Sequence, residues 1–282
     1  MRKVSVLTIT WKPWDFLLKQ AACLKEQTLP YDDWEWVVVD DCHQHRPTIL
    51  TGLNLPFRVL HIPPHELLST SEPLAAINTA LLYAEGELIH FMGDYMILGT
   101  SVLKTHWSLF ETYGPKVIIS GPVTALHTWR PAEERVPEVF IGPREDGIGW
   151  VESIDHIRRW YWATKNDSAG LEATLDINGF DERLDAHTGG GDVEFAMRMI
   201  SNGCKYLAET KTQSWEHDHQ GKKREWPRPV SWQDLFAKAQ RGEALWAPNG
   251  RNLRAERERL CEQSRSTTAT SHPRQRNLSP KP

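Results

Sequence analysis

AAINTALLYAEGELIHFMGDY, residues 75–95, contains the clearest pattern from which the fold can be predicted. Apolar side chains recur every three to four positions from Leu74 to Ala84, which predicts a helix with one apolar stripe that ends before Gly86. Residues 88–92 are almost continuously apolar, which is typical of a strand buried on both faces of a parallel sheet. A helix that leads directly into such a strand predicts one unit of an α/β fold.

The same alternation continues on both sides of this stretch. Apolar runs predict further strands, and helical spacing predicts further helices. The strands are expected at residues 4–10, 34–39, 57–62 and 117–120, and the helices at residues 14–24 and 101–113. Strands that alternate with helices form right-handed crossovers, so the sequence predicts a mainly parallel sheet flanked by helices.

Composition supports an ordinary globular protein. Of the 282 residues, 40% are hydrophobic and 25% are charged, which excludes a wholly disordered, collagen-like or fibrous chain. No apolar run approaches the ~20 residues that a membrane-spanning helix needs. The first residues lead straight into a strand pattern without the cleavage site of a signal peptide. These features predict a soluble protein in the cytoplasm.

The charge is concentrated at the C-terminal end. Residues 250–282 contain eight Lys and Arg against three Glu, although the whole chain has a net charge of −4. From Gln263 onward the sequence has few large apolar residues, so it cannot bury enough surface to offset the entropy of ordering. The sequence predicts that residues 250–282 form a basic, disordered tail, which either keeps the protein soluble or binds a polyanion.

Polar residues follow the predicted strands at their carboxyl ends. Thr10 and Trp11 come at the end of the first strand, and Asp40 and Asp41 come at the end of the second. Asp94 follows the strand expected at residues 88–92. Ligands of parallel α/β sheets bind at this edge, so we expect these residues to line one crevice. The sequence has neither a GxGxxG motif nor a P-loop, and a carboxylate site suggests that a metal balances any phosphate charge.

Four segments together resemble the family-2 glycosyltransferases, whose fold is called GT-A. They are VSVLTITWKP, VVVDD, residues 75–95 and NGFDERLDAHTGGGDVEFAMRMISNG, and they occur in the family's order within residues 4–205. The resemblance implies that residues 1–120 bind a nucleotide-diphosphate sugar and that residues 121–249 bind the acceptor. It implies an inverting hexosyl- or pentosyltransferase.

The resemblance also implies roles for individual residues. Asp192 falls where these enzymes place the general base, and Glu194 is the competing base. Asp94, His217 and His219 fall near the ligands of a divalent cation, Mn²⁺ or Mg²⁺. The residues expected to bind substrate are Thr10, Trp11, Asp40, Asp41, Asn78, Asp94, Tyr95, Gly190 and Gly191.

The motif at residues 92–96 departs from the family pattern. Asp94 is its single acid, and Tyr95 stands where a second metal-binding Asp is common. Lys222, Lys223 and Arg224 could therefore offset the diphosphate charge in place of a metal.

Several alternatives stay open at the level of sequence. Asp192 could be only an N-cap, since Asp is favoured there, and Asp40 and Asp41 could only begin a turn. The protein could be a non-catalytic sugar-nucleotide or glycan-binding protein, or a metal-dependent phosphoesterase that uses residues 217–219. The acceptor could be a glycan or a hydroxylated base in DNA, which would have to be flipped out of the helix.

Overall fold

The computed structural model gives the arrangement of most of the chain. The residues it describes are 2–10, 14–64, 74–126, 148–151, 164–184, 191–217, 238, 241, 243, 246–247 and 249–270. Within these residues, no helix is both long enough and apolar enough to cross a membrane.

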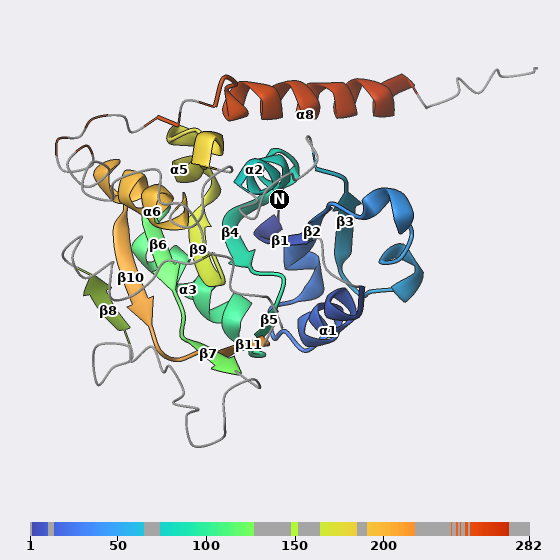
Figure 1. Cartoon of the computed structure of the whole chain (residues 1–282), viewed down its shortest axis with the longest axis horizontal. Helices are drawn as coiled ribbons and strands as arrows, with labels where there is room; N and C mark the ends of the chain where they lie inside the picture. Colours follow the sequence, from blue (N-terminus) through green and yellow to red (C-terminus); the bar gives the residue numbers. More distant parts are fainter. Residues whose placement is uncertain are drawn as a thin grey trace, which may run out of the picture.

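The centre of the molecule is an eight-stranded sheet with the strand order β3-β2-β1-β4-β9-β6-β10-β8 (Figure 1). Strands β8 and β9 run antiparallel to their neighbours, and the other pairs are parallel. The strands are β1 (Arg2–Thr10), β2 (Trp34–Asp40), β3 (Arg58–Ile62), β4 (Gly86–Met92), β6 (Val117–Ser120), β8 (Ile148–Val151), β9 (Asn166–Gly170) and β10 (Lys205–Glu209). The predicted α/β class and mainly parallel sheet are confirmed.

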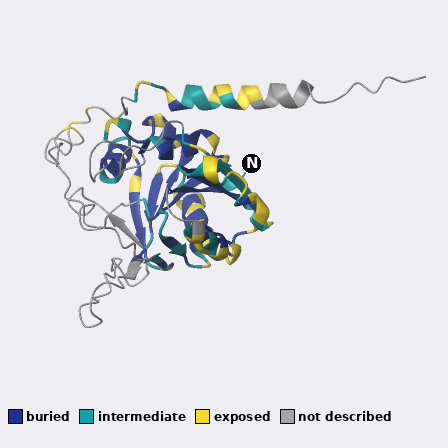
Figure 2. Ribbon diagram, turned by 45° about the vertical axis from the view of Figure 1, so that its right-hand side comes forward, coloured by how far each residue is buried: buried dark blue, intermediate teal, exposed yellow. Residues whose placement is uncertain are grey.

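Helices cover both faces of this sheet and create two hydrophobic cores. One core packs α2, α5 and α6 against the sheet, and the other packs α1 and α3 against its opposite face. The helices are α1 (Trp14–Lys25), α2 (Leu74–Tyr83), α3 (Val102–Tyr113), α5 (Leu171–Asp176), α6 (Gly191–Ser201) and α8 (Leu253–Thr270), with short 3₁₀ turns η1 (Tyr31–Asp33), η2 (His43–His45), η3 (Thr51–Leu53) and η5 (Glu182–Leu184). Figure 2 shows the strands buried between these layers, as their apolar sequences predict.

A second, smaller sheet extends the first beyond the carboxyl end of β4. It has the order β5-β11-β7, formed by β5 (Met96–Leu98), β11 (Ser214–His217) and β7 (Val123–Leu126). Only the residues Gly93 to Tyr95 separate β4 from β5, so the chain turns from one sheet into the other at the predicted acidic motif.

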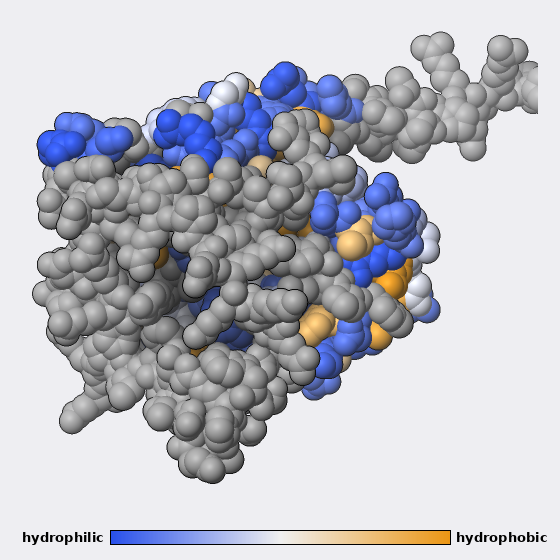
Figure 3. All heavy atoms as spheres, in the orientation of Figure 1, coloured by the Kyte–Doolittle hydropathy of each residue, from blue (hydrophilic) through white to orange (hydrophobic). Residues whose placement is uncertain are grey.

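The prediction of a disordered tail is wrong for residues 253–270. They form helix α8, which lies across α2 (Figure 1) and buries Leu253 completely. Arg257 donates hydrogen bonds to the carbonyls of Leu81 and Leu82 at the end of α2. The outer side of α8 is mostly hydrophilic in Figure 3, which explains why composition alone indicated disorder. The rest of the predicted tail, residues 271–282, lies outside the described residues.

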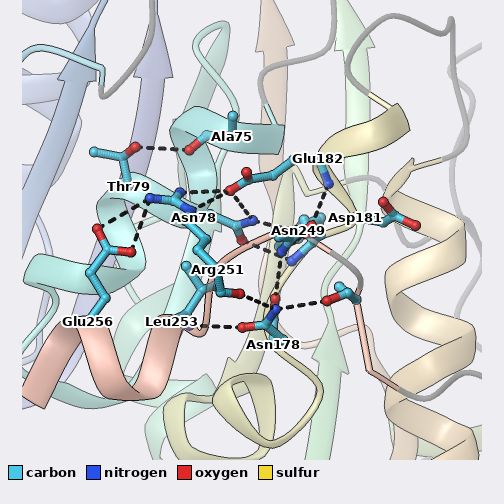
Figure 4. Close-up of polar contacts among 12 residues, drawn as sticks. Ala75, Asn78, Thr79, Asn178, Asp181, Glu182, Asn249, Arg251, Leu253 and Glu256 are labelled. Carbon is cyan, nitrogen blue, oxygen red and sulfur yellow. Dashed lines mark hydrogen bonds and ion pairs between the residues drawn. The ribbon is translucent and has the colours of Figure 1, made fainter.

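A buried polar network connects the start of α8 to the segment before α6 (Figure 4). Asn178 donates to the carbonyls of Ala247 and Arg251, at 2.8 and 2.9 Å, and its side-chain oxygen accepts from the N–H of Leu253 at 2.8 Å. Asn249 donates to the carbonyl of Asn178, and Arg251 forms an ion pair with Glu182 at 2.7 Å. The network therefore anchors the C-terminal helix to the segment that leads to Asp192.

Candidate active site

The turn that carries Asp94 is fixed from both sides. In the strand register, Met92 at the end of β4 lies opposite Asn166 of β9, and Met96 at the start of β5 lies opposite Glu216 of β11. Gln20 of α1 donates to the carbonyl of Gly93 at 2.8 Å. The turn is thus held between a strand of the main sheet and a strand of the small sheet.

An ion pair closes across this turn. Lys165 immediately precedes β9, and its Nζ lies 2.8 Å from Oε2 of Glu216. Burial raises the pKa of the Tyr95 hydroxyl, and the negative charges of Asp94 and Glu216 raise it further. The ring of Tyr95 packs edge-on against Phe16 at 5.5 Å, which directs its aromatic part toward α1.

Asp192 approaches the same place from the first turn of α6. Its Oδ1 accepts a hydrogen bond from the N–H of Val193 at 2.8 Å. Burial raises the pKa of Asp192 to about 6, with a further contribution from the charge of Asp167, while Lys165 lowers it. A carboxylate with a pKa near the working pH is suited to act as a general base.

Asp167 is a second carboxylate near Asp192, and strand β9 holds it in place. Ser120 of β6 donates to Asp167, and Oδ2 of Asp167 accepts from the N–H of Lys165 at 3.2 Å. We call Asp94, Lys165, Asp167, Asp192 and Glu216 the strand-end cluster. Asp192 thus lies within electrostatic reach of Lys165 and Asp167, and these two residues stand at the end of β9 that pairs with Met92, directly before the turn of Asp94.

Asp40 lies at the neighbouring strand end but is used within the chain. Arg46 forms two hydrogen bonds to it at 2.7 Å, and His61 lies 2.9 Å from its Oδ2. The N–H of Cys42 adds a third donor at 2.9 Å. Asp40 thus holds in place the segment that follows β2. Thr10 of β1 lies directly opposite Asp40 in the strand register. Asp41, the residue after Asp40, is only partly buried, and its predicted role in substrate binding stays a prediction.

The contacts of Asp40 make stability dependent on pH. Burial alone would raise its pKa, but hydrogen bonds from His61 and Arg46 outweigh this effect and lower the pKa to about 2. Because the folded-state pKa lies below that of the unfolded chain, the stabilisation is present at neutral pH and is lost between about pH 4 and pH 2.

We expect Asp40→Asn to lower the free energy of unfolding by about 2 kcal/mol at pH 7 and to have little effect at pH 2. Urea denaturation of both proteins at several pH values would measure this. An equal loss at both pH values would show that shape, and not charge, determines the contribution of Asp40.

Two of the predicted site residues form contacts with other parts of the chain, away from the strand-end cluster. Asn78 is buried in α2, where its amide bonds to the N–H and carbonyl of Phe180 and to Glu182, each at 2.9 Å. Glu194 lies in α6 and forms a two-pronged ion pair with Arg198, which also donates to the carbonyl of Ile177. The geometry gives both residues a structural role and leaves Asp192 as the stronger candidate base.

Some predicted residues lie outside the described part of the chain. These are Trp11, Gly190, His219 and residues 222–224. His217 ends β11, one residue after Glu216, but its side chain is not described; Gly191 is the first residue of α6. Among the described side chains, no three His, Cys, Asp or Glu groups are arranged to hold a metal ion.

Sequence reasoning missed several residues that the fold brings into the site. Asp167 belongs to the polar strand sequence NDSAG, which lacks the apolar pattern of the other strands, and Lys165 immediately precedes it. Glu216 stands beside the histidines in SWEH, so attention to that motif could have found it. Arg46 and His61 are the partners of Asp40, and no recognisable sequence motif links them to it.

Comparison with solved structures places this arrangement among known folds. S. aureus TarS residues 1–349 in complex with UDP-GlcNAc match with a TM-score of 0.64 and 17% sequence identity, over 85% of this chain and 66% of TarS 1–349. The same fragment in complex with UDP matches with a TM-score of 0.58 and 17% identity, over 85% of this chain and 64% of the fragment. The chain has the GT-A fold.

The likeness to TarS is a likeness of fold. The sequence matches no family model and no curated protein. The chain spans slightly less than two thirds of the TarS fragments and 38% of the longer TarS structure, at 18% identity. The GT-A fold predicted from the four sequence segments is thus confirmed, over 85% of this chain.

Proposed function

We propose that this protein is an inverting glycosyltransferase that uses a nucleotide-diphosphate sugar, with UDP as the first nucleotide to test. The observation that carries the proposal is the approach of Asp192 to the turn of Asp94 in a GT-A fold, with the pKa of Asp192 near 6. Two TarS structures with this fold are complexes with UDP and with UDP-GlcNAc. The fold supports a donor site at the strand ends, and Asp192 supports a transfer step.

The proposed reaction is a single displacement at the anomeric carbon. The Asp192 carboxylate takes the proton of the acceptor hydroxyl as the acceptor oxygen attacks that carbon. The new C–O bond forms on the face opposite the diphosphate, whose bond to the sugar breaks with its electron pair leaving on the phosphate oxygen. The configuration inverts, and the products are the glycoside and the nucleoside diphosphate. Fixed placement of both substrates would supply much of the rate.

Asp94 is the residue that we propose to bind a divalent cation, together with His217 and His219. Its carboxylate suits Mg²⁺ or Mn²⁺, and Mg²⁺ commonly takes one or two protein carboxylates and completes its shell with phosphate and water. Asp94 is the one member of this set whose side chain the structure describes, since those of His217 and His219 lie outside the described side chains. When bound, the cation would offset the charge of the diphosphate.

A donor and acceptor screen tests the proposal. We expect the purified protein to bind at least one of UDP-, GDP- and dTDP-sugars in calorimetry and to transfer the sugar to an acceptor, detected by mass spectrometry. The screen should include glycans, membrane-free lipid-linked acceptors and DNA with hydroxymethylated bases, because the added mass identifies both sugar and acceptor. NMR of the product would show the anomeric configuration.

Distinct results would point to the alternatives. Donor binding with neither sugar transfer nor hydrolysis of the donor would favour a binding protein. Release of phosphate from aryl phosphates would favour a phosphoesterase. Absence of binding to every donor, with and without Mn²⁺, would contradict the proposal. Comparison of transfer in EDTA and in Mn²⁺ would test the cation. The cytoplasmic location expected from the sequence stays a prediction.

A further inference from the structure

Lys165 is a cation placed among the carboxylates of the strand-end cluster. The strand register fixes its position, because the next residue, Asn166, lies opposite Met92 directly before the Asp94 turn. A Cβ built on Gly93 would lie 3.7 Å from Cγ of Lys165, so the stem of the lysine side chain runs along this turn. Its position is thus determined by backbone pairing and not by a flexible loop.

The charge of Lys165 acts on both sides of the site. Its Nζ lies 2.8 Å from Glu216, which is opposite Met96 in the strand register, directly after the Asp94 turn on the expected donor side. Its charge also lowers the pKa of Asp192, on the expected acceptor side. Lys165 therefore stands between the group that would meet the donor and the group that would meet the acceptor.

A donor diphosphate needs positive charge at this place. Asp94, Asp167 and Glu216 would all repel its phosphate oxygens, and like charges in a partly buried site are strongly unfavourable. The ammonium group of lysine has three donors and can hold a carboxylate and a phosphate oxygen together. The Lys165 side chain is 38% exposed, whereas that of Glu216 is 16% exposed, so the lysine is the more accessible partner of the pair.

We propose that Lys165 binds the diphosphate of the nucleotide-sugar donor while it keeps Glu216 as its second partner. This inference rests on the proposed function and adds to it a donor-binding residue that does not depend on a metal. As the bond to the sugar breaks, negative charge grows on the phosphate oxygen that leaves, and a fixed ammonium group stabilises that charge.

A purely structural role predicts different behaviour. The ion pair between Lys165 and Glu216 also joins the main sheet to the small sheet, so it could serve only to hold β9 and β11 together. In that case, loss of either partner should have the same effect. If Lys165 binds phosphate, loss of Glu216 leaves the cation available, whereas loss of Lys165 removes it.

The experiment compares UDP with uridine in calorimetry on the full chain in excess Mg²⁺. We expect Lys165→Met to weaken UDP binding about 10- to 100-fold, as for the loss of a charge-assisted hydrogen bond, and to leave uridine binding unchanged. Lys165→Arg should bind UDP within about threefold of the wild type, since it keeps the charge. Glu216→Gln should bind UDP at least as tightly as the wild type. Lys211→Met, at an exposed lysine, is the matched control.

Thermal melting of each variant shows whether it is folded and whether both partners of the pair contribute equally to stability. Equal weakening of UDP binding by Lys165→Met and Glu216→Gln, or an equal loss of uridine binding, would overturn the inference and leave a structural ion pair. UDP binding by Lys165→Met at the wild-type level would overturn it as well, while the proposed function would stand. If the wild type binds no nucleoside diphosphate, both the inference and the proposed function fail.

Discussion

Asp192→Asn is expected to lower kcat for sugar transfer by about 10²- to 10⁴-fold, the usual contribution of a general base. Asparagine keeps the shape of the side chain but cannot accept the proton of the acceptor hydroxyl. Donor binding should stay within about threefold of the wild type, because Asp192 acts on the acceptor. Steady-state kinetics and calorimetry with the same donor would measure both effects.

The pH dependence of the reaction gives a second test of Asp192. Burial and the charge of Asp167 raise its pKa to about 6, so wild-type kcat/KM should fall as the pH drops below about 6 and the base becomes protonated. The residual activity of Asp192→Asn should lack this fall. Glu194→Gln is the control, because Glu194 is occupied by Arg198 and its loss should leave the midpoint near pH 6.

Stability separates the catalytic from the structural interpretation of Asp192. A folded-state pKa above the usual value of 3.8 means that the folded protein resists ionisation of this carboxyl, so stability falls as pH rises from about 4 to 6. Asp192→Asn should therefore stabilise the protein by about 3 kcal/mol at pH 7 and by little near pH 4. A loss of about 1 kcal/mol at pH 7 would instead identify Asp192 as an N-cap.

Asn178→Ala is expected to have the largest effect on folding, about 3–4 kcal/mol of lost stability in urea denaturation. The backbone of Asn178 has a φ of 61°, in the left-handed region that costs alanine roughly 1 kcal/mol. Alanine also leaves the N–H of Leu253 and the carbonyls of Ala247 and Arg251 without the partner shown in Figure 4. Each unsatisfied buried group costs about 1–3 kcal/mol.

Two further variants divide this effect into its parts. Asn178→Gly accepts the left-handed backbone but still lacks the amide, so it should recover about 1 kcal/mol relative to alanine. Asn252→Ala, at an exposed asparagine that caps only the N–H of Ala255, should cost no more than about 1 kcal/mol. If Asn178→Ala and Asn252→Ala have equal effects, the C-terminal segment is not held by the network of Figure 4.

Much of the fold could be predicted because its parallel strands are apolar throughout. The apolar runs of β1, β2 and β4 reflect burial on both faces of the sheet. The apolar stripe of α2 reflects the packing of this helix against the sheet. Strand β9 escaped this pattern, because Asn166, Asp167 and Ser168 are buried with their side chains in hydrogen bonds to other parts of the chain. Polar groups can be buried when they are paired, and their partners are not visible in sequence.

The candidate site shows the same limit. Asp94 and Asp192 were predicted from strand ends and family resemblance, and their roles stay predictions, while the structure adds Lys165 and Asp167 as charged groups that act on Asp192. Asn78 and Glu194 have residue types equally suited to a site, yet Phe180 and Arg198 engage them. Lys165 was missed because its role depends on which strand lies beside β4, and β9 reaches that position only through the antiparallel pairing of the folded sheet.

The position of α8 has a consequence for synthesis of the protein on the ribosome. Arg257 bonds to the carbonyl of Leu82, which lies 175 residues earlier in the chain. The α2 side chains that share a hydrophobic core with Leu253 therefore stay uncovered on this side until residue 253 has emerged from the exit tunnel. We expect a product truncated before residue 253 to expose this apolar surface and to aggregate more readily.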